Sequence, residues 1–108
     1  MRRAVDTVPE RIAIVATGGI NHWPATPDSG KVNEAWDREF LARWSRNDQT
    51  ALLQYTDAGC YRDGGQGAFE IRTLIALAAA ARGVGTVRYS QAIPIFAVSC
   101  TVGTMEVA

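Results

Sequence analysis

The side chain best suited to proton transfer is His22, the only histidine among the 108 residues. An imidazole titrates near neutral pH, so a histidine can both accept a proton and return it. His22 follows Gly18 and Gly19, which permit a sharp turn or a close approach of the backbone to a ligand. A lone loop histidine is also commonly a surface or hydrogen-bonding residue, so spacing by itself leaves both interpretations open.

Glu70 is the second candidate, because of the residues around it. It lies near the start of a helix predicted over residues 68–82, with Leu74, Leu77 and Ala81 on the same helical face. A carboxylate on an apolar face needs a cation, a hydrogen-bonding cluster or a metal. The alternative is that Glu70, in the first helical turn, interacts with the helix dipole or pairs with an arginine.

A predicted strand precedes His22 and would position it. Residues 12–16 form an unbroken apolar run, which is typical of a parallel strand covered on both faces. His22 then lies just past the carboxyl end of this strand, where open α/β sheets bind ligands. Residues 24–30 contain two prolines and a glycine, which predict a long irregular loop.

Residues 33–46 are predicted to form a helix. Asn33 can cap its amino end, and Trp36, Phe40 and Trp44 recur at steps of four residues. This aromatic stripe could line a site, but it is interpreted here as a face that packs in the core.

The remaining elements are two further helices and two short strands. A short helix is expected over residues 49–56, and Gly83 follows the helix over 68–82 as its C-cap residue. Alternating side chains within residues 87–98 predict two short strands, with Pro94 at a sheet edge or a strand start.

Length and composition indicate one small domain without a nucleic-acid or membrane partner. The chain has 11 basic and 11 acidic residues, so no charge excess attracts nucleic acid or an anionic membrane surface. No apolar run reaches the length of a membrane span, and no signal peptide is recognisable, so a cytoplasmic location is expected. Cys60 and Cys100 lack the spacing of a zinc site, and a disulfide is not expected in a reducing compartment.

Three blocks of the sequence resemble the class III extradiol ring-cleavage dioxygenases, the family of the protocatechuate 4,5-dioxygenase β subunit. They are ATGGINHWP at residues 16–24, GKVNEAWDREFL at 30–41 and GAFEIRTL at 67–74. The resemblance extends from Arg11 to about Phe96. It implies an α/β fold, a partial three-layer sandwich with a mostly parallel sheet flanked by helices. Residues 1–108 would then be the C-terminal portion of a larger catalytic domain.

The resemblance also implies a ferrous iron held by two histidines and one glutamate, with a separate acid–base histidine. By this resemblance the iron-binding glutamate is Glu70 and the acid–base residue is His22. Gly19, Asn21 and Trp23 are expected to bind the substrate. Because His22 is the only histidine, both histidine ligands are missing, and the Fe(II) site in this chain is expected to be incomplete.

The expected reaction is extradiol cleavage of a catechol-type ring by O₂. The chain is expected to be inactive alone and to need a missing amino-terminal portion or a partner chain. Unpaired strand edges would make it marginally stable or drive it into a homo-oligomer. The alternative is a non-catalytic binding or regulatory module that keeps the scaffold. A phosphate cradle at residues 17–19 is weakly supported, because the usual glycine-rich phosphate-binding motifs are absent.

Overall fold

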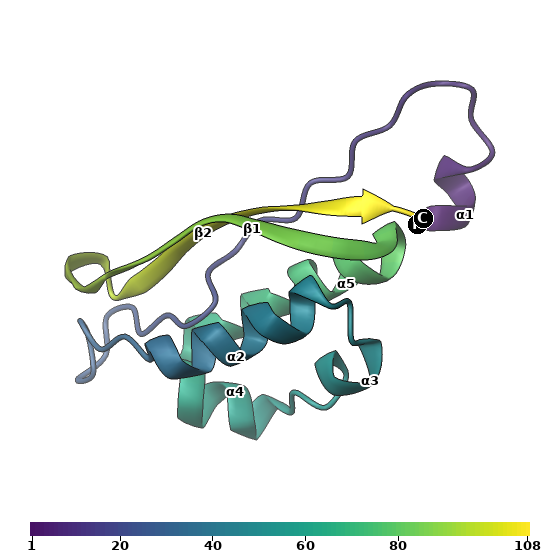
Figure 1. Cartoon of the computed structure of the whole chain (residues 1–108). Coiled ribbons are helices and arrows are strands. Elements are labelled where there is room, and N and C mark those ends of the chain that lie inside the picture. The colour runs from purple at the N-terminus through teal and green to yellow at the C-terminus, as the bar shows by residue number, and fades with distance from the viewer.

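The computed structural model describes all residues from 1 to 108, and a long β-hairpin lies across a layer of helices (Figure 1). In chain order the elements are α1 (Arg2–Val5), α2 (Glu34–Ser45), α3 (Gln49–Leu52), α4 (Asp57–Gly64), the 3₁₀ helix η1 (Gln66–Glu70), α5 (Ile71–Ala81), β1 (Arg82–Ile93), the 3₁₀ turn η2 (Pro94–Phe96) and β2 (Val98–Val107). No helix combines the length and the apolar character that crossing a bilayer requires.

Helix α2 confirms the prediction made from the four-residue spacing. The Asn33 side chain accepts a hydrogen bond from the Trp36 backbone N–H at 3.2 Å, which satisfies one of the free donors at the helix start. Trp36, Phe40 and Trp44 are all buried, with Phe40 fully inaccessible. The aromatic stripe is therefore part of the core, as interpreted from the sequence.

Helix α5 begins later than predicted, because residues 66–70 form the 3₁₀ helix η1 instead of its first turn. Its buried face carries Ile71, Ile75 and Ala78. The predicted C-cap at Gly83 is wrong, since Arg82 takes the left-handed conformation that ends the helix, with φ of 70°. Gly83 belongs to β1, where a Cβ would clash with the Glu106 carbonyl oxygen.

The two strands β1 and β2 form one antiparallel hairpin, which is longer than the two short strands predicted. Pairing ends at Ile93 and Val98, and a four-residue turn joins them. The turn closes through Ala97, whose φ is 52° and whose N–H donates to the Pro94 carbonyl at 2.9 Å. Pro94 therefore starts a turn here and interrupts neither strand.

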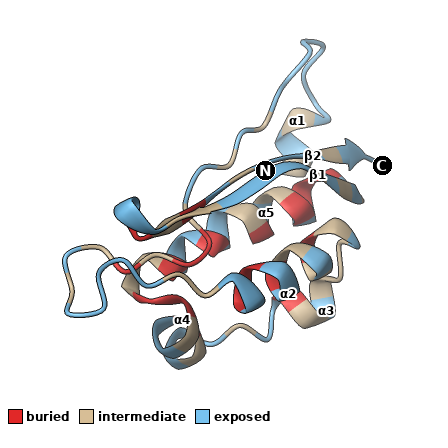
Figure 2. Ribbon diagram, turned by 60° about the vertical axis from the view of Figure 1, so that its left-hand side comes forward, coloured by how far each residue is buried: buried red, intermediate tan, exposed pale blue.

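The hairpin packs directly on the helices through two of its glycines. A Cβ at Gly85 would lie 2.7 Å from the ring of Trp44, and a Cβ at Gly103 would lie 2.9 Å from it. Only glycine lets the indole reach the strand backbone at these positions. The buried residues accordingly lie on the sides of the helices that face the hairpin and one another (Figure 2).

The strand predicted at residues 12–16 does not form. These residues follow an irregular path, and residues 10–16 make no hydrogen bond within the chain. Ile12 is 50% exposed and Val15 is 79% exposed. A strand exists only where a second backbone offers donors and acceptors, and no element of this chain does so here. The α/β class is confirmed, but the only sheet is antiparallel, not mostly parallel.

Two helical predictions between residues 47 and 65 also need correction. The helix expected over 49–56 is shorter, since α3 ends at Leu52. Helix α4, over Asp57–Gly64, was not expected, although Thr56 caps it by accepting a hydrogen bond from Gly59 N–H at 3.1 Å. Cys60 on this helix is buried and free, while Cys100 on β2 is exposed and free.

Candidate active-site loop

The loop over residues 17–24 passes close to the start of α5. The Thr73 hydroxyl donates to the Thr17 carbonyl oxygen at 2.7 Å, which holds the start of the loop against α5. Gly18 has φ of 147°, and a Cβ there would lie 2.6 Å from the Cβ of Glu70. A glycine at residue 18 is thus required for the loop to approach Glu70 so closely.

Glu70 is exposed, in contrast to the inward-facing position expected from the helical pattern. The pattern misled because residue 70 ends η1 and precedes the first residue of α5, so it does not continue the apolar face of that helix. Its Oε2 atom accepts a hydrogen bond from the Gly19 backbone N–H. Glu70 takes part in none of the ion pairs of the structure, so pairing with an arginine is not its function here.

The backbone of His22 is held on both sides. Its N–H donates to the Gly64 carbonyl at 2.7 Å, and its carbonyl accepts from Gly67 N–H at 3.0 Å. It also forms an isolated antiparallel bridge with Val98 at the start of β2. A Cβ at Gly67 would lie 2.7 Å from the imidazole Cγ and Nδ1, so the ring packs directly over that glycine.

His22 and Glu70 lie on the same side of the molecule, on either side of Gly19. The position of a Cβ on Gly19 would be 3.4 Å from Glu70 Oε2 and 3.6 Å from His22 Cβ. These two atoms can therefore be no farther apart than the sum of those distances, about 7 Å. The half-buried His22 side chain therefore starts close to the carboxylate, on the loop that hydrogen-bonds to it.

Asn21 and Trp23 flank His22, and both are buried. Asn21 is fully inaccessible, while Trp23 is 5% exposed. The backbone N–H of Trp23 donates to the Ala97 carbonyl at 3.2 Å, and the Lys31 ammonium lies 4.9 Å from the centre of the Trp23 indole ring. In this structure both side chains hold the loop in place, and Gly19 alone of the three expected substrate-binding residues stands next to Glu70.

The sequence did not point to Asp37, the residue that binds Asn21. Asp37 follows Trp36 on α2 and is only 3% exposed. Its Oδ1 accepts from Asn21 N–H at 3.1 Å, and its Oδ2 accepts from the Asn21 side-chain amide. The sequence gives one indication that Asp37 is buried, because the helical spacing places it beside the aromatic stripe of α2.

Burial raises the pKa of the Asp37 carboxyl, and hydrogen bonds from Ser99 and Asn21 oppose this only in part. A raised pKa means that the folded protein binds this proton more tightly than the unfolded chain does. The contribution of Asp37 to stability therefore falls as the pH rises from the ordinary range of a carboxyl through the raised pKa.

A prediction about the turn at Gly65 tests how tightly the loop is packed. Gly65 has φ of 84°, and a Cβ there would lie 2.5 Å from the His22 carbonyl oxygen and 2.7 Å from the Trp23 ring. Gly30 is a matched control, because its φ is 93° but a Cβ would meet nothing nearer than 3.6 Å. We expect Gly65→Ala to lower the free energy of unfolding by about 1–3 kcal/mol more than Gly30→Ala.

Urea denaturation of both variants measures this difference. Equal losses for the two would mean that the backbone at residue 65 can move away from His22 and Trp23 without cost, and the tight packing of the loop would be disproved.

The donor set of this chain fits one part of a metal site. The Glu70 carboxylate is exposed, and only one of its oxygens accepts a hydrogen bond, so the other is free to bind a cation. No group of three or more histidine, cysteine, aspartate or glutamate side chains is placed to hold a metal ion. The chain therefore offers one exposed carboxylate, with the half-buried side chain of His22 on the loop that hydrogen-bonds to it.

Comparison with known proteins places these residues in context. The family model described as the catalytic LigB subunit of aromatic ring-opening dioxygenase matches residues 1–103. A 2,3-dihydroxyphenylpropionate/2,3-dihydroxicinnamic acid 1,2-dioxygenase of Burkholderia vietnamiensis is 42% identical over 67 residues, which are 58% of this chain and 21% of that protein. A gallate dioxygenase of Pseudomonas putida is 37% identical over 75 residues, which are 68% of this chain and 22% of that protein. The matched region thus spans about a fifth of either relative.

Proposed function

The chain belongs to the family of catalytic LigB subunits of aromatic ring-opening dioxygenases, and on this premise we propose that it contributes to the extradiol cleavage of a catechol-type ring by O₂. The observation that carries the proposal is the approach of the His22 Cβ atom to Glu70 Oε2 beside Gly19, where the two atoms are no more than about 7 Å apart. An imidazole and a carboxylate that start from such positions can act on one small substrate. In the reaction the ring carbon–carbon bond beside the two hydroxyls breaks, and both oxygen atoms of O₂ enter the product.

Glu70 is proposed to be the carboxylate ligand of a ferrous iron. When bound, such an ion lowers the pKa of a coordinated hydroxyl and brings a catechol and O₂ together. The Gly19 N–H donates a hydrogen bond to one oxygen of the Glu70 carboxylate. This bond fixes the orientation of the carboxylate and so the direction of its other oxygen. The two histidine ligands are proposed to come from outside this chain, because His22 is its only histidine.

His22 is proposed to be the acid–base residue. Its backbone is held by Gly64 and Gly67, and its ring packs over Gly67, so the imidazole has a defined place in the loop. It would take the second phenolic proton from the substrate and return a proton as the ring opens. Gly19 is proposed to line the substrate site through its backbone, while Asn21 and Trp23 contribute by shaping the loop.

The partner is proposed to be the rest of the dioxygenase domain, joined to this chain or supplied as a second polypeptide. Residues 10–16 supply a row of backbone groups without partners and carry exposed Ile12 and Val15. Two mostly apolar cavities of about 370 and 390 Å³ lie along this segment, against α5 and β2. An added strand would satisfy the backbone and cover these apolar side chains. Self-association of the chain is the competing way to cover the same surface.

The test combines this chain with the polypeptide encoded next to it, provided that this polypeptide carries two histidines. Iron binding and O₂ uptake are measured on a panel of catechols, with each protein alone and with both together. Activity only in the combination supports the proposal, and neither iron binding nor activity in any arm contradicts it. Tight binding of an aromatic compound that chelators do not affect would support the non-catalytic module instead.

Replacement of Glu70 provides the sharpest variant for this test. Glu70→Gln keeps the shape of the side chain but removes its charge, so we expect the affinity for Fe(II) to fall by about tenfold or more. Glu106→Gln is the control, because Glu106 is an exposed carboxylate on β2. Iron titration of the combined proteins distinguishes the two, and equal affinities in both variants would remove Glu70 from the site.

A further inference from the structure

A buried polar cluster joins three parts of the structure next to His22. Asp37 on α2 accepts hydrogen bonds from both the backbone and the side chain of Asn21. The Asn21 side-chain nitrogen also lies 3.2 Å from the Ser99 hydroxyl on β2. Asn21, Asp37 and Ser99 are at most 4% exposed. The cluster therefore ties the loop, the helix and the hairpin together in a place that is largely closed to solvent.

The cluster is one residue away from the contacts that hold His22. Asn21 precedes His22 on the loop, and Ser99 follows Val98, the residue that pairs with His22. The His22 N–H, which donates to the Gly64 carbonyl, belongs to the peptide that joins Asn21 to His22. A movement of Asn21 therefore reaches the residue whose ring packs over Gly67.

We propose that Asp37 is a positioning residue, whose ionised carboxylate holds Asn21 and through it fixes the imidazole of His22 over Gly67. The inference rests on the proposed function of His22 as the acid–base residue. Asp37 touches neither His22 nor Glu70, so it acts only through the loop.

The charge on Asp37 decides the geometry of the cluster. An ionised carboxylate only accepts hydrogen bonds, and both donors of Asn21 face it. A protonated carboxyl must also donate, and the buried Oδ1 atom of Asn21 is an acceptor without a partner. Rotation of the Asn21 amide would bring that oxygen to the new donor. Protonation of Asp37 therefore changes how the residue before His22 is held.

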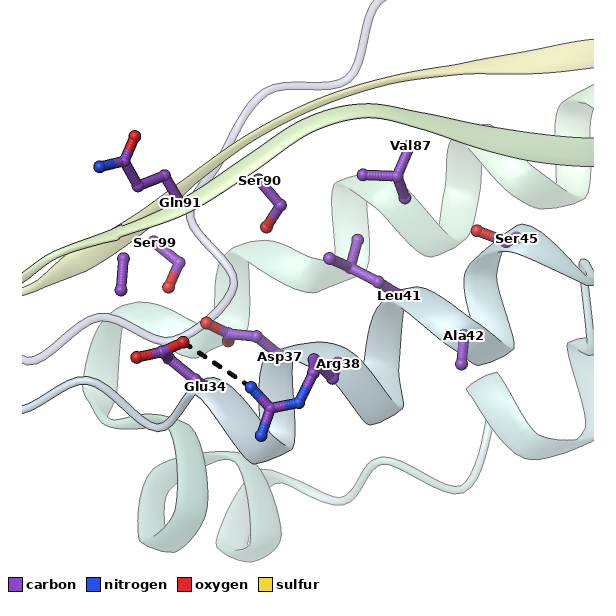
Figure 3. A pocket seen from close by; sticks show the side chains of 11 residues that line it. Glu34, Asp37, Arg38, Leu41, Ala42, Ser45, Val87, Ser90, Gln91 and Ser99 are labelled. Carbon is purple, nitrogen blue, oxygen red and sulfur yellow. Dashed lines mark ion pairs between the residues drawn. The ribbon is translucent and has the colours of Figure 1, made fainter.

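The surroundings of Asp37 raise its pKa, because burial disfavours the ionised carboxylate. Asp37 lines a cavity of about 620 Å³ between α2 and the hairpin, in which its carboxylate points toward Ser99 (Figure 3). The charged groups that share this cavity are Glu34 and Arg38, which pair with each other at 3.7 Å on α2. The hairpin contributes only neutral side chains there, so no cation from β1 or β2 keeps Asp37 ionised.

The single histidine makes the test unambiguous, because one imidazole gives one set of side-chain resonances. The His22 ring signals are followed by ¹H–¹³C NMR from pH 3 to 9, a range chosen to span both titrations. In the unmodified chain we expect two inflections, and the second one, which does not come from the ring itself, is assigned to Asp37. Asp37→Asn should abolish the second inflection and shift the ring signals at neutral pH.

Glu34→Gln is the matched control, because Glu34 lies on the same helix and cavity but does not bind Asn21. It should keep both inflections. Ser99→Ala removes the hydroxyl that hydrogen-bonds to Asn21 and Asp37 and should move the second inflection without abolishing it. A single inflection in the unmodified chain overturns the proposal even if Asp37→Asn fails to fold. The same holds if Asp37→Asn folds and leaves the His22 signals unchanged. No arm needs iron or turnover, so failure of the proposed function would be seen separately.

Discussion

Replacing His22 by glutamine is expected to lower the proposed ring-opening rate of this chain combined with its partner polypeptide by about 10²–10⁴-fold, the range that one general acid–base group supplies. Glutamine keeps a polar side chain of similar length but cannot take up a proton near neutral pH. The backbone contacts of residue 22 with Gly64 and Gly67 do not depend on the side chain, so the loop should keep its path. The loss should therefore be in turnover and not in folding.

Oxygen uptake and iron titration of the same samples separate the possible outcomes. His22→Gln should retain Fe(II), since the ligand proposed in this chain is Glu70. Cys100→Ala serves as the control, because Cys100 is exposed on β2 and should leave the rate unchanged. A His22→Gln enzyme with an unaltered rate would exclude His22 from proton transfer, and one that loses iron would assign it to the metal instead.

Phe40→Ala is expected to lower the free energy of unfolding by about 3–5 kcal/mol. Phe40 is fully inaccessible, and its ring centre lies 5.6 Å from that of Tyr55 and 6.4 Å from that of Trp36. Removing the ring leaves a cavity between α2 and its neighbours that these aromatic side chains cannot fill without moving. A domain of this size has about 5–15 kcal/mol in total, so much of the stability would be lost.

Urea denaturation followed by tryptophan fluorescence measures this loss, because Trp36 and Trp44 lie on the same helix face. Leu53→Ala is the control, since Leu53 is 75% exposed and its truncation should change stability by less than about 0.5 kcal/mol. Similar values for the two variants would mean that the aromatic stripe of α2 is not the core of the isolated chain.

Helix α2 shows which features follow from local sequence. Its cap and its aromatic stripe depend on residues three or four positions apart, and the structure has both where the spacing predicts them. The hairpin was underestimated for the opposite reason, because its register depends on pairing across the turn at residues 94–97. Residues 12–16 have the composition of a buried strand, yet they remain without a partner, since strand formation requires a second backbone.

The position of Glu70 shows the limit of reasoning from helical periodicity. Its apolar neighbours at helical spacing indicated an inward side chain, but η1 ends at this residue and leaves it exposed. The raised pKa of Asp37 could not be predicted either, because the burial that raises it comes from the packing of the loop and the hairpin against α2. Both features depend on contacts between helices, strands and loops, and a short stretch of sequence does not reveal those contacts.

Residue types and spacing made His22 and Glu70 candidates, and the three blocks carried the resemblance to the ring-opening dioxygenases that implied a role for each, because these are properties of the chain itself. Packing of the loop over residues 17–24 against α5 and β2 brought Gly19 to Glu70, across 51 positions of sequence, and placed the His22 Cβ atom within about 7 Å of Glu70 Oε2. It also enclosed Asp37 against Asn21. Contacts between distant residues depend on the path of the whole chain, and so only the folded structure could reveal them.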